Sequence, residues 1–235
     1  LFDLRRSLST IESIVKILNH SDEDDSHAEE NDGWRREKKY TYPTLHRLAK
    51  DVITFPQIIQ RIDQILDKYG KIRDNATPEL LQIRRELAKT EGSISRTLYS
   101  ILRSAQSEGV VEKDVTPTLR DGRLVIPVIP TLKKKIKGIV HDESATGKTV
   151  FIEPTEVVES NNRVRELEGE ERKEIIRILT NFTNKVRPYV REMMDSYRFL
   201  AKIDLIQAKA KIAEIFKAIE PEVEDHPHID WIRAI

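Results

Sequence analysis

The sequence predicts a mainly α-helical protein in which a small antiparallel β sheet is inserted between long antiparallel helices. Apolar residues recur at spacings of three and four on both sides of the middle of the chain, as they do on one face of a helix. Between these segments, Asp121-Gly122 separates two runs of strand-forming residues, which is a strong hairpin signal. The composition, with 34% charged and 6% aromatic residues, is typical of long, solvated helices.

Residues 1–112 are predicted to form a helical core and the outgoing half of an arm. A first helix is indicated by an apolar series that weakens at Gly70, namely Val52, Phe55, Ile59, Ile62, Leu66 and Tyr69. Thr77-Pro78-Glu79 then supplies an N-cap, a proline at the first helical position and an acid for the helix dipole. The next apolar seam runs from Leu80 to Ala105. Two long helices joined by a short turn are expected to pack as an antiparallel arm.

Residues 153–235 are predicted to form the returning helices and the rest of the core. Glu153-Pro154-Thr155-Glu156 has the pattern of a helix start, and Pro188 is expected to end or kink that helix. A further helix is expected to stop before Pro221. Each of these two helices carries an apolar stripe that we expect to be a packing seam. The stripe of the first consists of Leu167, Ile175, Ile178, Phe182 and Val186. The stripe of the second consists of Val190, Met193, Tyr197, Leu200, Leu205, Ala208, Ile212, Ile215 and Ile219.

Charge is balanced over the whole chain and segregated within it. Lysine plus arginine and aspartate plus glutamate number 40 each, so attraction to a polyanion must come from a local cluster. Residues 20–33 are acidic and almost free of apolar side chains, which predicts a mobile loop. The chain has no cysteine, and no signal peptide or membrane-spanning run is visible, so we expect a cytoplasmic protein. Because Leu1 already lies inside a helical pattern, we expect a fragment of a larger protein.

The predicted sheet, residues 113–152, carries the candidate binding site. Residues 115–120 should pair with 123–129, and two more short strands should flank the turn from Ser144 to Lys148. Flexible cations at the turns and edges of a sheet can contact phosphates without reading base edges. Lysines on strand edges also prevent aggregation, which is the alternative interpretation. The candidate nucleic-acid-binding residues are Arg120, Arg123, Lys133, Lys134, Lys135, Lys137 and Lys148.

The sequence offers little support for catalysis or metal binding. Gly147-Lys148-Thr149 resembles part of a phosphate-binding loop, but Asp142 stands where such a loop needs glycine, so we expect no ATP binding. Adjacent strand residues such as His141 and Asp142 alternate faces and cannot converge on one ion. His226 and His228 have better spacing but follow a proline-broken segment. We therefore expect no catalytic residue, metal or cofactor in this chain.

Several motifs closely resemble the MutS-two family, paralogues of the bacterial mismatch-repair protein MutS. The run Leu119-Arg120-Asp121-Gly122-Arg123-Leu124-Val125-Ile126-Pro127-Val128 is followed by Lys137-Gly138-Ile139-Val140-His141-Asp142. Ser144-Ala145-Thr146-Gly147, Phe151-Ile152-Glu153-Pro154 and Asn161-Asn162 continue the likeness. The segments 74–85 and 205–213 are also similar to that family, whereas the acidic residues 20–33 depart from it.

The resemblance implies the core, lever and clamp region of a bacterial, homodimeric ATPase. It implies that ATP and Mg²⁺ bind in a separate ATPase domain, that a nuclease domain follows it, and that clamp sheets close on duplex or branched DNA to suppress recombination or assist repair. Some members of the family split collided ribosomes, so structured RNA is an alternative target. A purely structural coiled-coil dimerisation arm is a third hypothesis, and it predicts an apolar sheet. No membrane partner is implied.

Overall fold

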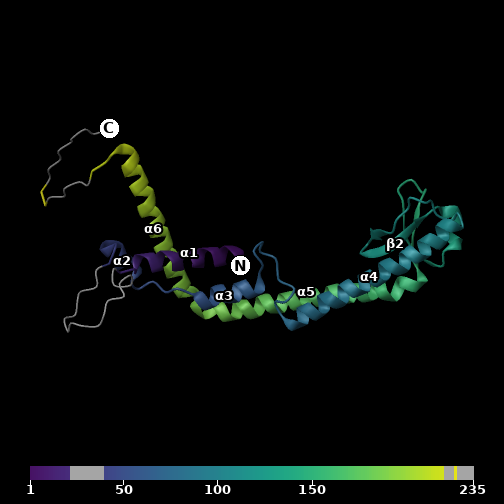
Figure 1. Ribbon diagram of the computed structural model, residues 1–235, viewed down its shortest axis with the longest axis horizontal. Coiled ribbons are helices and arrows are strands. Elements are labelled where there is room, and N and C mark those ends of the chain that lie inside the picture. Colours follow the sequence, from purple (N-terminus) through teal and green to yellow (C-terminus); the bar gives the residue numbers. More distant parts are fainter. Residues whose placement is uncertain (22–39, 220–224, 227–235) are drawn as a thin grey trace, which may run out of the picture. The chain divides into compact units, whose positions relative to one another are not determined.

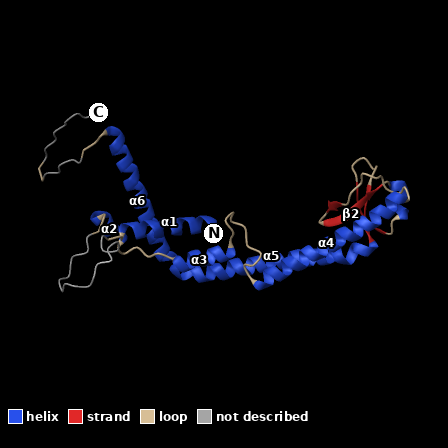
Figure 2. Ribbon diagram, in the orientation of Figure 1, coloured by secondary structure: helices blue, strands red, loops and turns tan. Residues whose placement is uncertain are grey.

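The structure, a computed structural model, describes residues 1–21, 40–219 and 225–226 of the chain. Its secondary structure is mainly helical, with one small four-stranded antiparallel sheet (Figure 2), which confirms the coarse fold prediction. The chain divides into two compact units, residues 1–2 with 60–187 and residues 3–59 with 188–235. The predicted mobile loop falls mostly on residues 22–39, outside the described part.

The first unit is built on two long helices, α4 (Pro78–Ser107) and α5 (Val158–Val186), which lie antiparallel along each other (Figure 1). Helix α4 begins as predicted, because the Thr77 hydroxyl accepts a hydrogen bond from the Leu80 amide at 3.1 Å. Helix α5 ends at Val186, just before Pro188, also as predicted.

The antiparallel pair differs from the expected one. The first predicted helix was to extend from Val52 to Tyr69, but helix α3 covers only Pro56–Ile65 and is too short to serve as an arm. Pro56 sets the start of α3, and the backbone turns after Leu66, where the Asp67 carboxylate accepts from the amides of Tyr69 and Lys71. The long helix that packs along α4 is therefore α5, which follows the sheet in the sequence.

The sheet joins the far ends of α4 and α5. Its strands are β1 (Thr118–Arg120), β2 (Arg123–Val128), β3 (Gly138–Glu143) and β4 (Val150–Pro154), in the order β1-β2-β4-β3. Asp121 and Gly122 both have positive φ, 46° and 73°, as a tight hairpin turn requires. Short 3₁₀ helices η1 (Pro130–Lys135) and η2 (Thr155–Val157) precede β3 and α5.

One hydrophobic core holds the sheet against α4 and the start of α5. Ile126, Val128 and Ile152 of the central strands are at most 2% exposed. They cluster with buried residues of the two helices, of β4 and of the connecting segments, namely Ile94, Leu98, Leu102, Ala105, Val110, Val111, Ile136, Val150, Val157 and Val164. This packing fixes the sheet at one end of the helix pair, where its connecting segments face solvent.

The second unit contains α1 (Phe2–Leu18), α2 (Pro43–Ala49) and, after the 3₁₀ turn η3 (Arg187–Tyr189), α6 (Val190–Phe216). Its core joins Ile11, Val15, Leu18, Ala49 and Phe199. The predicted seam of α6 is wrong at Val190, which is 51% exposed, and again beyond Leu200. There Leu205, Ile212, Ile215 and Ile219 are 54–81% exposed. Their spacing correctly predicted that these side chains share one helix face. Within the described residues, however, no element packs against that face.

Candidate nucleic-acid interface

Five of the seven candidate cations are lysines on exposed connections of the sheet. Lys133, Lys134 and Lys135 form the second half of η1, Lys137 immediately precedes β3, and Lys148 lies in the turn between β3 and β4. All five are exposed, and none forms an ion pair with a residue that the structure describes. Their ammonium groups can therefore meet an anion without first breaking an internal contact.

Three of the five lysines line two separate clefts. Lys148 lines one together with Glu112, Pro130 and Thr131. Lys135 and Lys137 line another, beside Ser104 of α4, Glu108 immediately after that helix and Glu156 of η2. The cations thus surround the connections of the sheet, and carboxylates accompany them in both clefts.

Edge protection does not account for the lysine run. In the strand order β1-β2-β4-β3 the edges of the sheet are β1 and β3. Lys133, Lys134 and Lys135 belong to the 3₁₀ helix between β2 and β3, so they do not lie on the exposed edge of a strand. This placement means that edge protection does not explain three adjacent, unpaired lysines.

The two candidate arginines differ from the lysines. The Arg120 guanidinium stacks over the Phe151 ring, 4.2 Å from its centroid, and remains exposed. Arg123 is 14% exposed and donates to Glu153 Oε1 at 2.7 Å and to Asn162 Oδ1 at 2.6 Å. Two of its donors are engaged inside the protein, which favours the supporting role for Arg123.

Glu153 is the centre of a buried polar network that the sequence did not reveal. It was predicted to start a helix, but it lies in β4 with a fully buried side chain, and α5 begins only at Val158. His141 Nε2 lies 2.5 Å from Glu153 Oε2, and the Asn161 amide donates to Oε1 at 2.7 Å. Three strands and α5 are thereby tied together through one carboxylate.

A β-bulge explains how His141 reaches this carboxylate. The pairing of β3 with β4 shifts between Val140 and Asp142, which leaves His141 as the extra residue. Bulges redirect a side chain that would otherwise alternate with its neighbours. His141 therefore turns toward Glu153, whereas Asp142 and Glu143 are exposed.

The network keeps Glu153 ionised. Burial raises the pKa of its carboxyl, but hydrogen bonds from Asn161, His141 and Arg123 outweigh burial and hold that pKa below the usual range. The result is a buried anion matched by a guanidinium, which is a structural arrangement without an open position for a ligand.

The structure also places the remaining motif residues. Gly147 has a φ of 67° and lies in a turn closed by the Thr149 amide, which donates to Ser144 Oγ at 3.0 Å. A strand follows, as predicted for Gly147-Lys148-Thr149. Within residues 1–21, 40–219 and 225–226, no group of three or more potential ligand residues is arranged to hold a metal, and His228 lies outside that part.

Comparison with known proteins identifies the family. Endonuclease MutS2 of Levilactobacillus brevis is 40% identical over 198 residues, which cover 84% of this chain and 25% of that protein. The chain belongs to the MutS2 family. Endonuclease MutS2 of a Geobacillus species is 37% identical and that of Enterococcus faecalis 34% identical, with the same coverage. No protein-family model matches the chain.

The chain spans about a quarter of the length of these MutS2 relatives. Four of the five motifs behind the resemblance meet in one network, since Arg123, His141 and Asn161 contact Glu153 and Arg123 also donates to the exposed Asn162. In the described part of the chain, no helix is both long and apolar enough to cross a membrane.

Proposed function

We propose that this chain is the lever and clamp region of a MutS2 protein, and that its sheet binds the phosphate backbone of duplex or branched DNA without sequence preference. In this proposal α4 and α5 form the lever, and the sheet with η1 forms the clamp. The observation that carries it is the group of five exposed lysines without ion pairs among the described residues, Lys133, Lys134, Lys135, Lys137 and Lys148.

The chain itself is proposed to be non-catalytic. Its most conspicuous buried polar cluster, around Glu153, is satisfied internally and offers no nucleophile with a free base. ATP and Mg²⁺ are proposed to act in another part of the MutS2 protein, in a homodimer that suppresses recombination or takes part in repair. The name endonuclease, carried by the relatives, would likewise refer to a part that this chain does not match.

The hypothesis of a purely structural dimerisation arm has less support. It predicts a continuous apolar face on the sheet. The exposed apolar side chains of the strands are Leu119 on β1 and Ile139 and Val140 on β3, and these strands are the two opposite edges of the sheet. Apolar exposure is therefore divided, whereas the unpaired lysines are grouped on the connections.

The salt dependence of DNA binding tests the proposed clamp. Replacing Lys133, Lys134 and Lys135 with alanine should lower the slope of log affinity against log salt by about 2 to 3, since each phosphate contact contributes about 0.9. Fluorescence anisotropy with branched DNA across a salt series measures the slope, after circular dichroism has shown that the variant is folded. Substitution of Arg172, Lys173 and Lys185, exposed cations of α5, is the matched control.

Two outcomes would count against this proposal. An unchanged slope in the triple-lysine variant would move the binding surface off the sheet. An equal loss in the α5 control would mean that the chain responds only to its net charge. Repeating the series with a structured RNA of the same length separates DNA from RNA as the preferred ligand.

A further inference from the structure

Helix α4 carries a row of cations that the sheet-centred proposal does not use. Arg85, Lys89, Arg96 and Arg103 follow one another at intervals of four, seven and seven residues. At 3.6 residues per turn these intervals place all four within an arc of about 40°. We call them the α4 stripe. All four are exposed.

The face that carries the α4 stripe is free of acids. The glutamates of α4 are Glu79, Glu86 and Glu91, and the same helical geometry puts each of them at least about 60° away from every stripe residue. The buried side of α4, with Leu80, Ile94 and Leu98, is opposite. Arg85 and Lys89 are like charges four residues apart, an arrangement that by itself lowers helix stability.

Three other arginines of the helix pair form ion pairs, in contrast with the stripe. Arg84 pairs with Glu171 at 2.8 Å, Arg163 with Glu86 at 2.8 Å, and Arg177 with Glu174 at 2.6 Å. These pairs join α4 to α5 or brace α5. No residue in the described part of the chain forms an ion pair with a stripe residue. The sequence therefore separates arginines that hold the helices together from cations left open to solvent.

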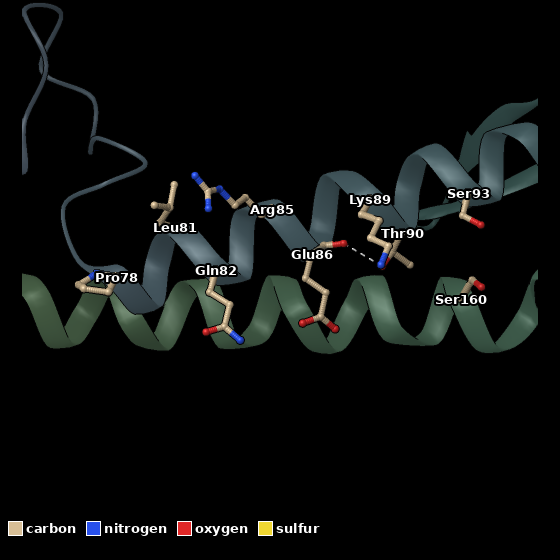
Figure 3. Close-up of a pocket in the computed structure, with 9 residues that line it drawn as sticks. All are labelled: Pro78, Leu81, Gln82, Arg85, Glu86, Lys89, Thr90, Ser93 and Ser160. Atoms are coloured by element: carbon tan, nitrogen blue, oxygen red, sulfur yellow. Dashed lines mark hydrogen bonds between the residues drawn. The ribbon is translucent and has the colours of Figure 1, made fainter.

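A groove runs beside the stripe. Figure 3 shows Arg85 and Lys89 on α4, with Ser93 further along the helix and Ser160 contributed by α5. Glu86 also lines this groove, and its carboxylate is bound by Arg163, which pairs with Glu166 and Glu170 as well. Cations flanked by hydroxyl groups match the sugar-phosphate backbone, which presents anionic oxygens and few apolar groups.

The stripe leads to the sheet. Arg103 is adjacent in sequence to Ser104, which shares a cleft with Lys135 and Lys137. From Arg85 to Arg103 the helix rises about 27 Å, which equals about eight base-pair steps of B-DNA. Cations of the arm and of the sheet thus belong to one unit of the structure, the unit that includes residues 60–187.

We propose that the α4 stripe is a second nucleic-acid contact surface, which binds the phosphate backbone along the arm while the sheet lysines hold it at the tip. The inference extends the proposed clamp function, and it rests on a different set of residues. A ligand that reaches only the tip would not engage the stripe.

The test compares four proteins on a 30-base-pair duplex across a salt series. They are the wild type, a stripe variant with Arg85, Lys89, Arg96 and Arg103 replaced by glutamine, the triple-lysine variant, and a control with Arg172, Lys173, Lys185 and Arg187 replaced by glutamine. Glutamine is a good helix former, so α4 should persist, which circular dichroism verifies. We expect the stripe variant to lower the log–log salt slope by about 2 to 4 and the control to leave it unchanged.

Each outcome separates the stripe from the sheet. A slope lowered only in the triple-lysine variant overturns the stripe and leaves the proposed clamp intact. A slope lowered only in the stripe variant supports the stripe and overturns the clamp. An unchanged salt slope in both variants overturns the stripe proposal and the clamp proposal together. A slope that falls equally in the α5 control overturns the stripe proposal. An RNA duplex of equal length, measured in parallel, shows whether the stripe prefers the DNA or the RNA backbone.

Discussion

Replacing Glu153 with alanine is expected to destabilise the sheet by about 3 to 5 kcal/mol, the usual cost of leaving a buried charge without its partner. Arg123 is only 14% exposed, and it would lose the carboxylate that faces it at 2.7 Å. Asn161, which is 2% exposed, would lose an acceptor as well. Because the network ties three strands to α5, the loss of stability should extend over the whole sheet.

Amide hydrogen exchange over residues 118–154 measures this effect locally, which suits a chain with two compact units. Protection there should fall in the Glu153→Ala variant, and the Glu143→Ala variant, in which an exposed glutamate of β3 is removed, should match the wild type. Unchanged protection in Glu153→Ala would mean that the network contributes nothing to the sheet.

The pH dependence of the same protection has a definite sign. The pKa of Glu153 is lowered in the folded protein, so the folded state binds its proton less readily than the unfolded state. The stabilisation is therefore complete above the ordinary glutamate pKa of about 4.3, and it is lost as pH falls through the lowered value. The Glu153→Gln variant should lack that component.

A second large effect is expected from Gly138→Ala at the start of β3. A Cβ at this position would lie 2.2 Å from the carbonyl oxygen of Glu153 and 2.8 Å from its carbonyl carbon. Those atoms belong to the backbone of β4 and cannot rotate away, so the pairing of Gly138 with Pro154 must open. We expect a loss of about 1 to 3 kcal/mol, the range typical of overpacked sites.

Gly92→Ala is the matched control, since it makes the same chemical change in a different setting. Nothing lies within 4 Å of a Cβ at Gly92, which is in the interior of α4. This variant should be more stable by about 1 kcal/mol, because alanine is the better helix former. Urea denaturation should therefore show shifts of opposite sign. A tolerated alanine at Gly138 would contradict the described strand pairing.

Local signals made much of the fold predictable. The Asp121-Gly122 turn, the cap at Thr77 and the end of α5 before Pro188 each depend on a few adjacent residues, and the structure has all three. The five lysines were selected from their place at the predicted turns and edges of the sheet, and the structure puts them on exposed connections.

Long-range contacts explain what the sequence did not predict. Glu153-Pro154 has the composition of a helix start, and only the meeting of three strands with α5 makes Glu153 a buried strand residue. The pairing of α4 with α5 depends on contacts such as Arg84 with Glu171, 87 residues apart in sequence. In the sequence, Arg123 and Lys134 are both simply cationic residues. Only tertiary packing determines that Arg123 is buried and Lys134 exposed.

The central claim is that nucleic acid lies against the connections of the sheet. Lysine acetylation, read out by mass spectrometry with and without a branched DNA, tests it most directly. We expect DNA to protect Lys133, Lys134, Lys135, Lys137 and Lys148, while Lys173 and Lys185 on α5 react equally in both samples. Full reactivity of the five sheet lysines under conditions where the DNA is bound would contradict the account.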